Sequence, residues 1–411
     1  TKDQIKDRQI NNLVDLSSLT PNLHINANGI QSYGDIMTIR GIANTQLFGA
    51  PGVQLYVDGV PQADVSSYAS SLYEVESIEV LRGPQGYQFG KSVTGGAINV
   101  KTKSPGQEQS NEFSASYGTF NSQKYNLASK GPLDDQFSYS VAVRRALSDG
   151  FLTNSSGKDN TSKTWHGALK FHMDKGDGTQ VTFGANFETH ELGSQPIVYR
   201  NQADFYSRSA DFDEYTEIDR NQQFLTIRTE LDNTRLTSVT NRNDWSLSPN
   251  RLDLDVSAIP AATSIILQDQ IEWSQEFRLE SEAGSELDWN LGLFYSDNEI
   301  EGDSTRWFLT GFPAPADQDT QVTRYTLDSK NTGIFSSAGK SFSDKDYVSI
   351  GLRYDKFEKE MKRTKTSVLT GTSSVPGAKD FSSFSPSLTW EHAFSEGLTG
   401  NVRVTYAEKP G

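Results

Sequence analysis

The 411-residue sequence contains no cysteine and no long apolar run, and basic side chains are fewer than acidic ones. Without cysteine, the chain can form neither a disulfide scaffold nor a thiolate metal site. The lack of any run of ~18 apolar residues excludes helical membrane spans. It does not exclude a transmembrane β-barrel, whose strands are apolar on one face only. The 38 Lys and Arg against 53 Asp and Glu give a formal charge of −15, so we expect no nucleic-acid partner.

Two regions of different texture divide the chain near residue 106. In residues 1–106, a helix-like segment at Gln9–Leu19 precedes short strand-like runs separated by Gly and Pro turns. This texture predicts a small α+β domain. In residues 107–411, stretches of about 9–13 residues alternate apolar with polar side chains, as half-buried strands do. Phe137–Arg144 and Val348–Asp355 show the alternation most clearly.

The connections between the predicted strands fall into two length classes. Short polar turns alternate with long connections at about 148–162, 190–220, 247–267, 299–329 and 359–379. This segregation is typical of an outer-membrane barrel, whereas a soluble sandwich has shorter strands and less regular loops. We therefore expect an all-β, antiparallel transmembrane barrel, with a soluble or secreted β-rich binding protein as the alternative. About thirteen strands precede Gly411, and since such barrels close on an even number, we expect a truncated barrel.

Four motifs in the first region carry a family resemblance. They are Met37–Gly41 (MTIRG), Val53–Pro61 (VQLYVDGVP), Ser77–Gly86 (SIEVLRGPQG) and Gly95–Val100 (GGAINV). In this order and spacing they resemble the plug domain of TonB-dependent outer-membrane receptors. Weaker matches to the barrel of that family follow at Ser274–Leu279, Asn290–Tyr295, Gly351–Tyr354 and Phe384–Leu388. Through Leu55–Gln62 and Gly83–Gly96 the sequence is most similar to the siderophore branch, particularly yersiniabactin-receptor-like sequences.

The resemblance implies a plug domain (1–106) inside the lumen of a barrel (107–411) that has about 22 strands when complete. It implies import of a ferric siderophore from an extracellular vestibule, with plug remodelling driven by the TonB–ExbB–ExbD complex. The expected location is the outer membrane of a Gram-negative bacterium, as a monomer among lipid and lipopolysaccharide. Cobalamin or an oligosaccharide is the alternative cargo. The family's TonB-contacting box is missing, so we expect it and the last strands to lie outside this chain.

Catalytic signatures are missing from the sequence. It has no Gly-x-Ser-x-Gly elbow, no His-Glu-x-x-His motif and no phosphate loop, so we expect no enzyme. No resident cofactor and no protein-bound metal are expected, because the resemblance implies that iron travels within the siderophore. The acidic run Asp211–Glu217 is interpreted as a solvated surface that could attract divalent cations.

Three charged residues are candidates for a lock between plug and barrel. Arg40 and Arg82 each end a predicted strand that the barrel would enclose, and a buried guanidinium needs a carboxylate partner. In Trp273–Leu279, Glu276 alternates with the apolar side chains and should face the lumen. Because the family locks its plug with Arg–Glu pairs, Glu276 is our candidate acceptor. A lumen carboxylate solvated by water is the alternative.

Aromatic and basic residues on predicted outward-facing segments are candidates for ligand binding. They are Phe48, Tyr87, Phe89 and Lys91 in the plug, and Tyr206, Arg306 and Trp307 in the long connections. Flat aromatic chelates stack on such rings, and Lys or Arg attracts their negative charge. The alternative is that these aromatic rings pack loops together or belong to the interfacial girdle of a barrel.

Overall fold

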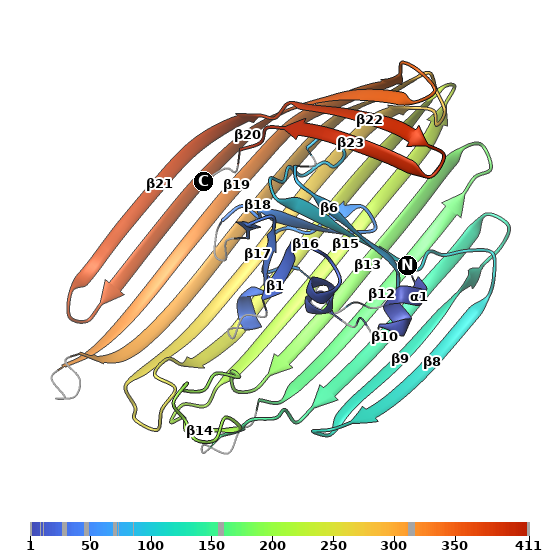
Figure 1. Ribbon diagram of the computed structural model, residues 1–411. Helices are drawn as coiled ribbons and strands as arrows, with labels where there is room; N and C mark the ends of the chain where they lie inside the picture. The colour runs from blue at the N-terminus through green and yellow to red at the C-terminus, as the bar shows by residue number, and fades with distance from the viewer. Residues whose placement is uncertain are drawn as a thin grey trace.

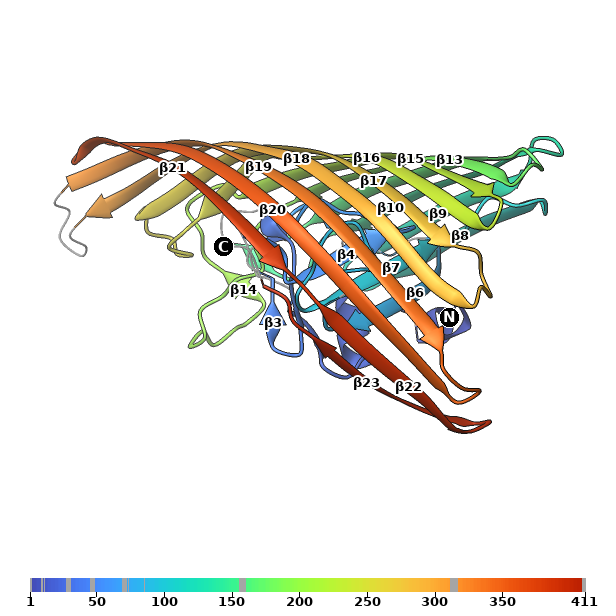
Figure 2. The ribbon, with the colours of Figure 1, turned by 90° about the horizontal axis from the view of Figure 1, so that it is seen from above.

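The computed structural model describes residues 2–8, 10, 12–26, 31–44, 49–68, 72, 74–84, 86–154, 160–310 and 317–408. A large, strongly curved sheet wraps around one side of a small N-terminal domain, which lies in its concavity (Figures 1 and 2). No helix among the described residues is long and apolar enough to cross a membrane.

The N-terminal domain contains short elements. They are α1 (Lys2–Asp7), the 3₁₀ helices η1 (Val14–Ser18) and η2 (Gln31–Tyr33), β1 (Leu23–Asn26), β2 (Ile36–Ile39), β3 (Ile42–Ala43), β4 (Val53–Val57), β5 (Val60–Pro61), β6 (Val75–Arg82) and β7 (Gly96–Thr102). Strands β1–β3 form one sheet and β5-β4-β7-β6 another, in which β4 and β7 are parallel. Leu23, Ile39, Leu55 and Ile98 are almost completely buried in the shared apolar core.

The predicted helix at Gln9–Leu19 forms only in part, as the 3₁₀ helix η1. Asn12 and Asp15 explain the difference, because each backbone N–H donates to the other's side-chain oxygen. Such local bonds compete with α-helical backbone bonds. The hairpin turn at Asp58–Gly59 forms as predicted, with φ angles of 55° and 80° that a two-residue turn of this kind requires.

Fourteen strands of the described residues form the large antiparallel sheet, and thirteen lie on one hydrogen-bonded path from β8 to β23. The strands are β8 (Ser110–Gly118), β9 (Ser122–Pro132), β10 (Phe137–Ser148), β12 (Ser162–Asp174), β13 (Thr179–Leu192), β15 (Tyr215–Leu231), β16 (Thr234–Asp253), β17 (Ala262–Ser281), β18 (Leu287–Thr310), β19 (Asp317–Ser341), β20 (Asp346–Ser367), β21 (Gly371–Phe384), β22 (Ser387–Ser395) and β23 (Leu398–Thr405). Because β21 and β22 pair with successive parts of β20, they form one strand interrupted at Ser385 and Pro386. Two short strands, β11 (Thr153–Asn154) and β14 (Ser207–Arg208), pair outside this sheet.

The predicted alternation distinguishes the two faces of the sheet. Trp273, Phe277 and Leu293 are about half exposed on the convex face, whereas Ser274 and Glu276 on the concave face are almost fully buried. The convex face is therefore apolar, and the concave face is polar where it meets the N-terminal domain. This is the alternation of a transmembrane β-barrel wall.

The predicted long connections are wrong at two places and too long at a third, where β16 and β17 leave only 254–261 of the predicted 247–267. Strands β18 and β19 continue through most of 299–329, and β20 and β21 occupy most of 359–379. Both faces are largely polar there, so the sequence loses its apolar alternation while the backbone pairing continues. Long connections remain at 149–161, 193–214 and 254–261, and we call this edge of the sheet the long-loop rim. The opposite edge, with turns such as 175–178 and 282–286, is the short-turn rim.

Candidate functional site

Arg353 on β20 attaches the sheet to the N-terminal domain. Its Nη1 donates to the carbonyl oxygens of Gly86 (3.0 Å) and Phe89 (3.1 Å), and its Nη2 donates to that of Gly90 (2.6 Å). Asp355, on the same face of β20, accepts from Nε and Nη2 at 2.6 Å each. All five guanidinium N–H groups thus have acceptors, and the side chains of Arg353 and Asp355 are completely buried. The pair fixes residues 86–90 against the wall of the sheet.

Glycine is required where the 86–90 segment meets the sheet. A Cβ atom on Gly86 would lie 3.1 Å from Cδ of Arg353. A Cβ atom on Gly90 would lie 2.3 Å from a carboxylate oxygen of Glu276 and 2.6 Å from the ring of Phe294. The backbone therefore approaches the sheet at a distance that a larger residue at position 90 would prevent.

A buried ion pair forms a second attachment. Lys91 donates from Nζ to both carboxylate oxygens of Glu272 on β17, at 3.0 and 2.8 Å, and to the carbonyl oxygen of Ala63. Asp64 lies beside this pair and accepts a 3.0 Å hydrogen bond from Gln270. Burial raises the pKa of Asp64 above its ordinary value of 3.8. Charges of both signs are therefore enclosed between the two domains.

Further polar side chains of the sheet donate to backbone carbonyls of the N-terminal domain. Asn241 and Asn243 both donate to the carbonyl of Pro61 at 3.1 Å, and Arg220 donates to that of Ser66 at 3.0 Å. Lys170 adds an ion pair with Asp58, at 2.7 Å. The interface combines these hydrogen bonds and ion pairs with two small apolar clusters, in which Tyr33 packs with Trp245 and Leu247 and Val60 packs with Phe224 and Val239.

The candidate lock residues are placed differently from one another. Glu276 is buried on the concave face beside Gly90, as its place in the apolar–polar alternation predicts. Its ion-pair partner, however, is Arg278 of the same strand, whose Nη2 and Nε donate to the Glu276 carboxylate at 2.5 and 2.9 Å. Arg40 and Arg82 are exposed at the ends of β2 and β6, not enclosed as predicted. Sequence reasoning missed Arg353, although the Gly351–Tyr354 motif puts it on the same face as Gly351.

The candidate ligand residues of the N-terminal domain lie against the sheet, not on the outward-facing segment that we predicted. The ring of Phe89 packs on Tyr56 with centroids 4.6 Å apart, and Lys91 is held by Glu272. Tyr87 lies under the guanidinium of Arg403, 4.9 Å away, in a cavity that also contains residues of the 282–286 turn. Arg353 explains this placement, because it draws residues 86–90 to the wall. Phe48 lies outside the described residues.

The three candidate ligand residues of the barrel do not all lie on the same face of the sheet. In β18, Arg306 shares the concave face with the buried Phe294 and Ile300. Trp307 therefore lies on the convex face with Leu293, and the prediction that Arg306 and Trp307 belong to a long loop is wrong. Tyr206 is exposed in the 193–214 connection at the long-loop rim. Of the three, Arg306 and Tyr206 are accessible from the concave side or the rim.

Arg306 acts electrostatically on a tyrosine of the N-terminal domain. Burial raises the pKa of Tyr33 to about 12, and the positive charge of Arg306 partly opposes this rise. The ring of Tyr33 packs beside Trp245 of β16, with centroids 6.4 Å apart. Both side chains are buried. These contacts join the N-terminal domain to the half of the sheet nearest the long-loop rim.

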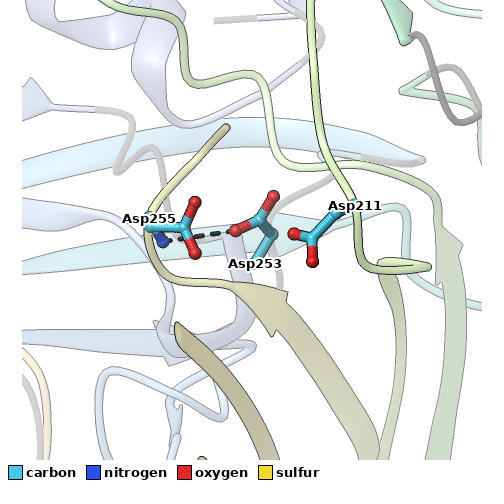
Figure 3. A group of neighbouring side chains, drawn as sticks. All are labelled: Asp211, Asp253 and Asp255. Atoms are coloured by element: carbon cyan, nitrogen blue, oxygen red, sulfur yellow. Dashed lines mark hydrogen bonds between the residues drawn. The ribbon is translucent and has the colours of Figure 1, made fainter. Parts of the chain in front are cut away.

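Three carboxylates converge at the long-loop rim, from Asp211, Asp253 and Asp255 (Figure 3). One oxygen of each lies within 4.8 Å of the others, and such oxygens are the ligands that Ca²⁺ prefers. Asp253 is held by backbone N–H groups of Asp255 and Val256, at 3.2 and 3.0 Å. Arg208 Nη2 lies 3.8 Å from Asp253 and already supplies positive charge to the group. Burial raises the pKa of Asp211.

Comparison with known families agrees with this architecture. Residues 1–97 match the family model "TonB-dependent Receptor Plug Domain", and residues 174–409 match "TonB dependent receptor-like, beta-barrel". The pesticin receptor of Yersinia pestis is 35% identical over 151 residues, which is 36% of this chain and 22% of that receptor. The catecholate siderophore receptor Fiu of Escherichia coli K12 is 24% identical over 290 residues, or 64% of this chain and 35% of the receptor.

Solved structures show the same fold. The ferric yersiniabactin uptake receptor FyuA from Yersinia pestis superposes with a TM-score of 0.85 at 19% identity, over 98% of this chain and 62% of FyuA. The open form of Fiu, the ferric-catecholate import receptor of E. coli K12, gives a TM-score of 0.73 at 13% identity, over 100% of this chain and 69% of Fiu. The chain thus spans less than two thirds of the length of the pesticin and yersiniabactin receptors that it matches.

Proposed function

The chain belongs to the TonB-dependent receptor family, and from this premise we propose that it imports a ferric siderophore across the outer membrane. The ligand binds in a vestibule on the long-loop side of the plug, and TonB remodels the plug to open a path. The relatives support this choice of cargo, since they include a ferric yersiniabactin receptor and a catecholate siderophore receptor. The plug corresponds to 1–106 and the barrel wall to 107–411. Iron enters as cargo within the chelate.

The many polar bonds between plug and sheet, beside two small apolar clusters, are the observation that carries the mechanism. Arg353, Lys91 and Asn241 all bond across it to groups that water can also satisfy. A hydrogen bond between neutral groups contributes about 0.5–1.5 kcal/mol net and one to a charged group about 1.5–3 kcal/mol, because water replaces the partner when the bond opens. An applied force that opens these bonds and the two small apolar clusters can therefore shift the plug while its own larger apolar core stays intact. No bond in the cargo needs to break, so the proposed activity is transport and not catalysis.

Residue roles follow from the placements. We assign ligand contact to Arg306 and Tyr206, which face the concavity or the long-loop rim. Phe48 keeps its place as a proposed ligand contact on the plug. Tyr87, Phe89 and Lys91 are assigned to the contact between plug and barrel, as is Glu276 with Arg278. Trp307 is left out because it lies on the convex face.

A binding titration tests the proposed cargo. The full-length receptor, purified in detergent, is titrated with ferric siderophores, cobalamin and oligosaccharides while tryptophan fluorescence is followed. Trp245 is a suitable reporter, because it is buried beside Tyr33 of the plug. We expect saturable binding of a ferric chelate, weakened by Arg306→Gln but not by Thr305→Ala on the convex face. Binding of cobalamin or an oligosaccharide, with no response to any iron chelate, would refute the siderophore assignment.

A further inference from the structure

Two cavities follow one another between the plug and the part of the wall formed by β10 to β16, which we call the β10–β16 sector. The first, the middle cavity, has a volume of about 900 Å³. Leu55 of β4 and Val100 of β7 line it on the plug side. On the wall side, Ala142 and Ala168 are directly opposite each other in β10 and β12, and their short side chains leave this space beside the plug.

The second cavity, the rim cavity, continues from the middle cavity to the short-turn rim. Its volume is about 1640 Å³, and it lies between the plug and strands β12 to β17. Arg235 and Glu280, beside the turns that join β15 to β16 and β17 to β18, line its outer end. The short turns of outer-membrane barrels lie on the periplasmic side. The rim cavity therefore extends toward the periplasm.

A single polar cluster lies where the two cavities meet. Lys170 of β12 and Thr102 of β7 line both of them. Lys170 forms an ion pair with Asp58 at 2.7 Å and donates to the hydroxyl of Thr102. Thr102 donates in turn to Asp58, from its backbone N–H at 2.8 Å and from its hydroxyl at 2.9 Å. We call Lys170, Asp58 and Thr102 the inner seal.

The inner seal can open without leaving a charge buried and unpaired. Both hydrogen bonds from Thr102 to Asp58 lie within the plug, so they persist when the plug moves away from β12. Lys170 already lines the rim cavity, from which water reaches its ammonium group once Asp58 leaves. Breaking a buried ion pair is costly mainly when one charge stays buried and unpaired. Neither charge does so here.

The outward end of the middle cavity is closed by the plug. Arg220 lines this end and donates to the carbonyl of Ser66 at 3.0 Å. Further toward the long-loop rim, Tyr33 packs against Trp245 and Leu247. Plug segments that face the proposed vestibule therefore separate it from the middle cavity, and their displacement would join the two.

The wall from β17 to β20 differs from this sector. Two cavities lie there as well, of about 830 and 1200 Å³, but they have no lining residue in common. Plug residues 86–90 fill the space between them, where Arg353 bonds to three of their carbonyls. A Cβ atom on Gly90 would lie only 2.3 Å from a carboxylate oxygen of Glu276. A whole plug segment therefore closes this side, whereas one cluster closes the β10–β16 sector.

We propose that the ferric chelate crosses the barrel along the β10–β16 sector, and that the ion pair of Lys170 with Asp58 is the inner gate of this route. The inference rests on the proposed siderophore import and adds the path of the cargo and the contact that closes it. The plug first uncovers the middle cavity from the vestibule. Separation of Asp58 from Lys170 then joins the middle cavity to the rim cavity and the periplasm.

Introduced cysteines test the route, because this chain contains none of its own. Ala168→Cys places a thiol in the middle cavity, and the matched control Ser274→Cys places one on the buried concave face of β17. Cells that produce the full-length receptor, free of other cysteines, are treated with a small charged methanethiosulfonate reagent. We expect the Ala168→Cys thiol to react roughly tenfold faster when both a ferric chelate and TonB are present, since reaction requires exposure. The Ser274→Cys thiol should show no such acceleration.

The inner gate is tested by adding Lys170→Met to the Ala168→Cys receptor. We expect the thiol then to react rapidly without TonB, because the rim cavity opens into the middle cavity. The control Lys163→Met removes a cation from the convex face of the same strand, where it pairs with Glu191 at 3.1 Å. In that variant the reaction should still require TonB. Unchanged chelate binding in both variants would show that the barrel is folded.

The outcomes separate this inference from the proposed function. If the receptor takes up a ferric chelate but the Ala168→Cys thiol reacts no faster, or the Ser274→Cys thiol accelerates equally, the route is overturned while siderophore import stands. If the reaction in Lys170→Met still requires TonB, the ion pair is not the gate. If the receptor takes up no ferric chelate at all, the proposed function fails and the inference fails with it.

Discussion

Replacing Arg353 with alanine removes every donor through which β20 holds plug residues 86–90. Three hydrogen bonds to plug carbonyls are lost, and the buried Asp355 is left without its guanidinium. Removing one partner of a buried ion pair costs about 3–5 kcal/mol, mostly because the other charge stays buried and unpaired. The folded receptor can recover part of this cost by letting the 86–90 segment detach and admit water to Asp355. We therefore expect a loosened plug segment in an otherwise folded barrel.

Hydrogen exchange in the full-length receptor measures that loosening directly. A local opening free energy lowered by about 3 kcal/mol corresponds to exchange more than ~100-fold faster. We expect this acceleration in peptides covering residues 84–92 and much less in β16 or β17. The double variant Arg353→Ala/Asp355→Ala should exchange more slowly than Arg353→Ala, because no unpaired buried charge remains. Arg324→Ala, which removes an exposed convex-face cation, is the control.

Either of two results would refute this reasoning. Unchanged exchange at 84–92 in a folded Arg353→Ala receptor would mean that other contacts hold the segment. Acceleration of equal size throughout the barrel would mean that Arg353 stabilises the whole fold and does not specifically attach the plug.

Three further predictions concern the same interface. Lys91→Met should leave Glu272 buried and unpaired and lower the free energy of unfolding by about 3–5 kcal/mol. Adding Glu272→Gln should restore much of the lost stability, measured by thermal denaturation. If the double variant is no more stable than Lys91→Met, the unpaired Glu272 carboxylate is not the cause of the loss. Gly90→Ala should displace the plug segment, since a Cβ there would lie 2.3 Å from a carboxylate oxygen, whereas Gly106→Ala meets nothing within 4 Å. We expect limited proteolysis to show increased cleavage near residue 90 in Gly90→Ala but not in Gly106→Ala. Because burial raises the pKa of Asp64 in the folded state, that state binds this proton more tightly than the unfolded chain does. Asp64 therefore contributes stability below its unfolded pKa that is lost as pH rises through the folded pKa. Asp64→Asn should then raise the melting temperature relative to wild type at neutral pH, and this difference should vanish below pH 3.8. A difference in melting temperature that does not change with pH would contradict a raised pKa of Asp64.

The strands and their two faces could be predicted from the sequence wherever apolar and polar residues alternate clearly. Alternation placed Glu276 on the concave face and Phe277 on the convex face, and the structure agrees. It failed in the polar outer parts of β18 and β19, where neither face is consistently apolar. Trp307 was therefore assigned to a loop, although unbroken backbone pairing puts it on the convex face.

The contacts of the candidate site were harder to predict for a different physical reason. Arg353 bonds to carbonyl oxygens of Gly86, Phe89 and Gly90, and every residue has such an acceptor. Nothing in a sequence indicates which carbonyls a docked domain will present to a strand far away in the chain.

Uptake of radiolabelled iron by cells is the most direct test of the central claim. The full-length receptor is produced in a Gram-negative host that lacks its own siderophore receptors, with and without TonB, and is supplied with ferric chelates. We predict saturable accumulation of iron from at least one ferric siderophore that requires both the receptor and TonB. Accumulation that persists without TonB, or cells that take up cobalamin or a glycan but no iron chelate, would contradict the account.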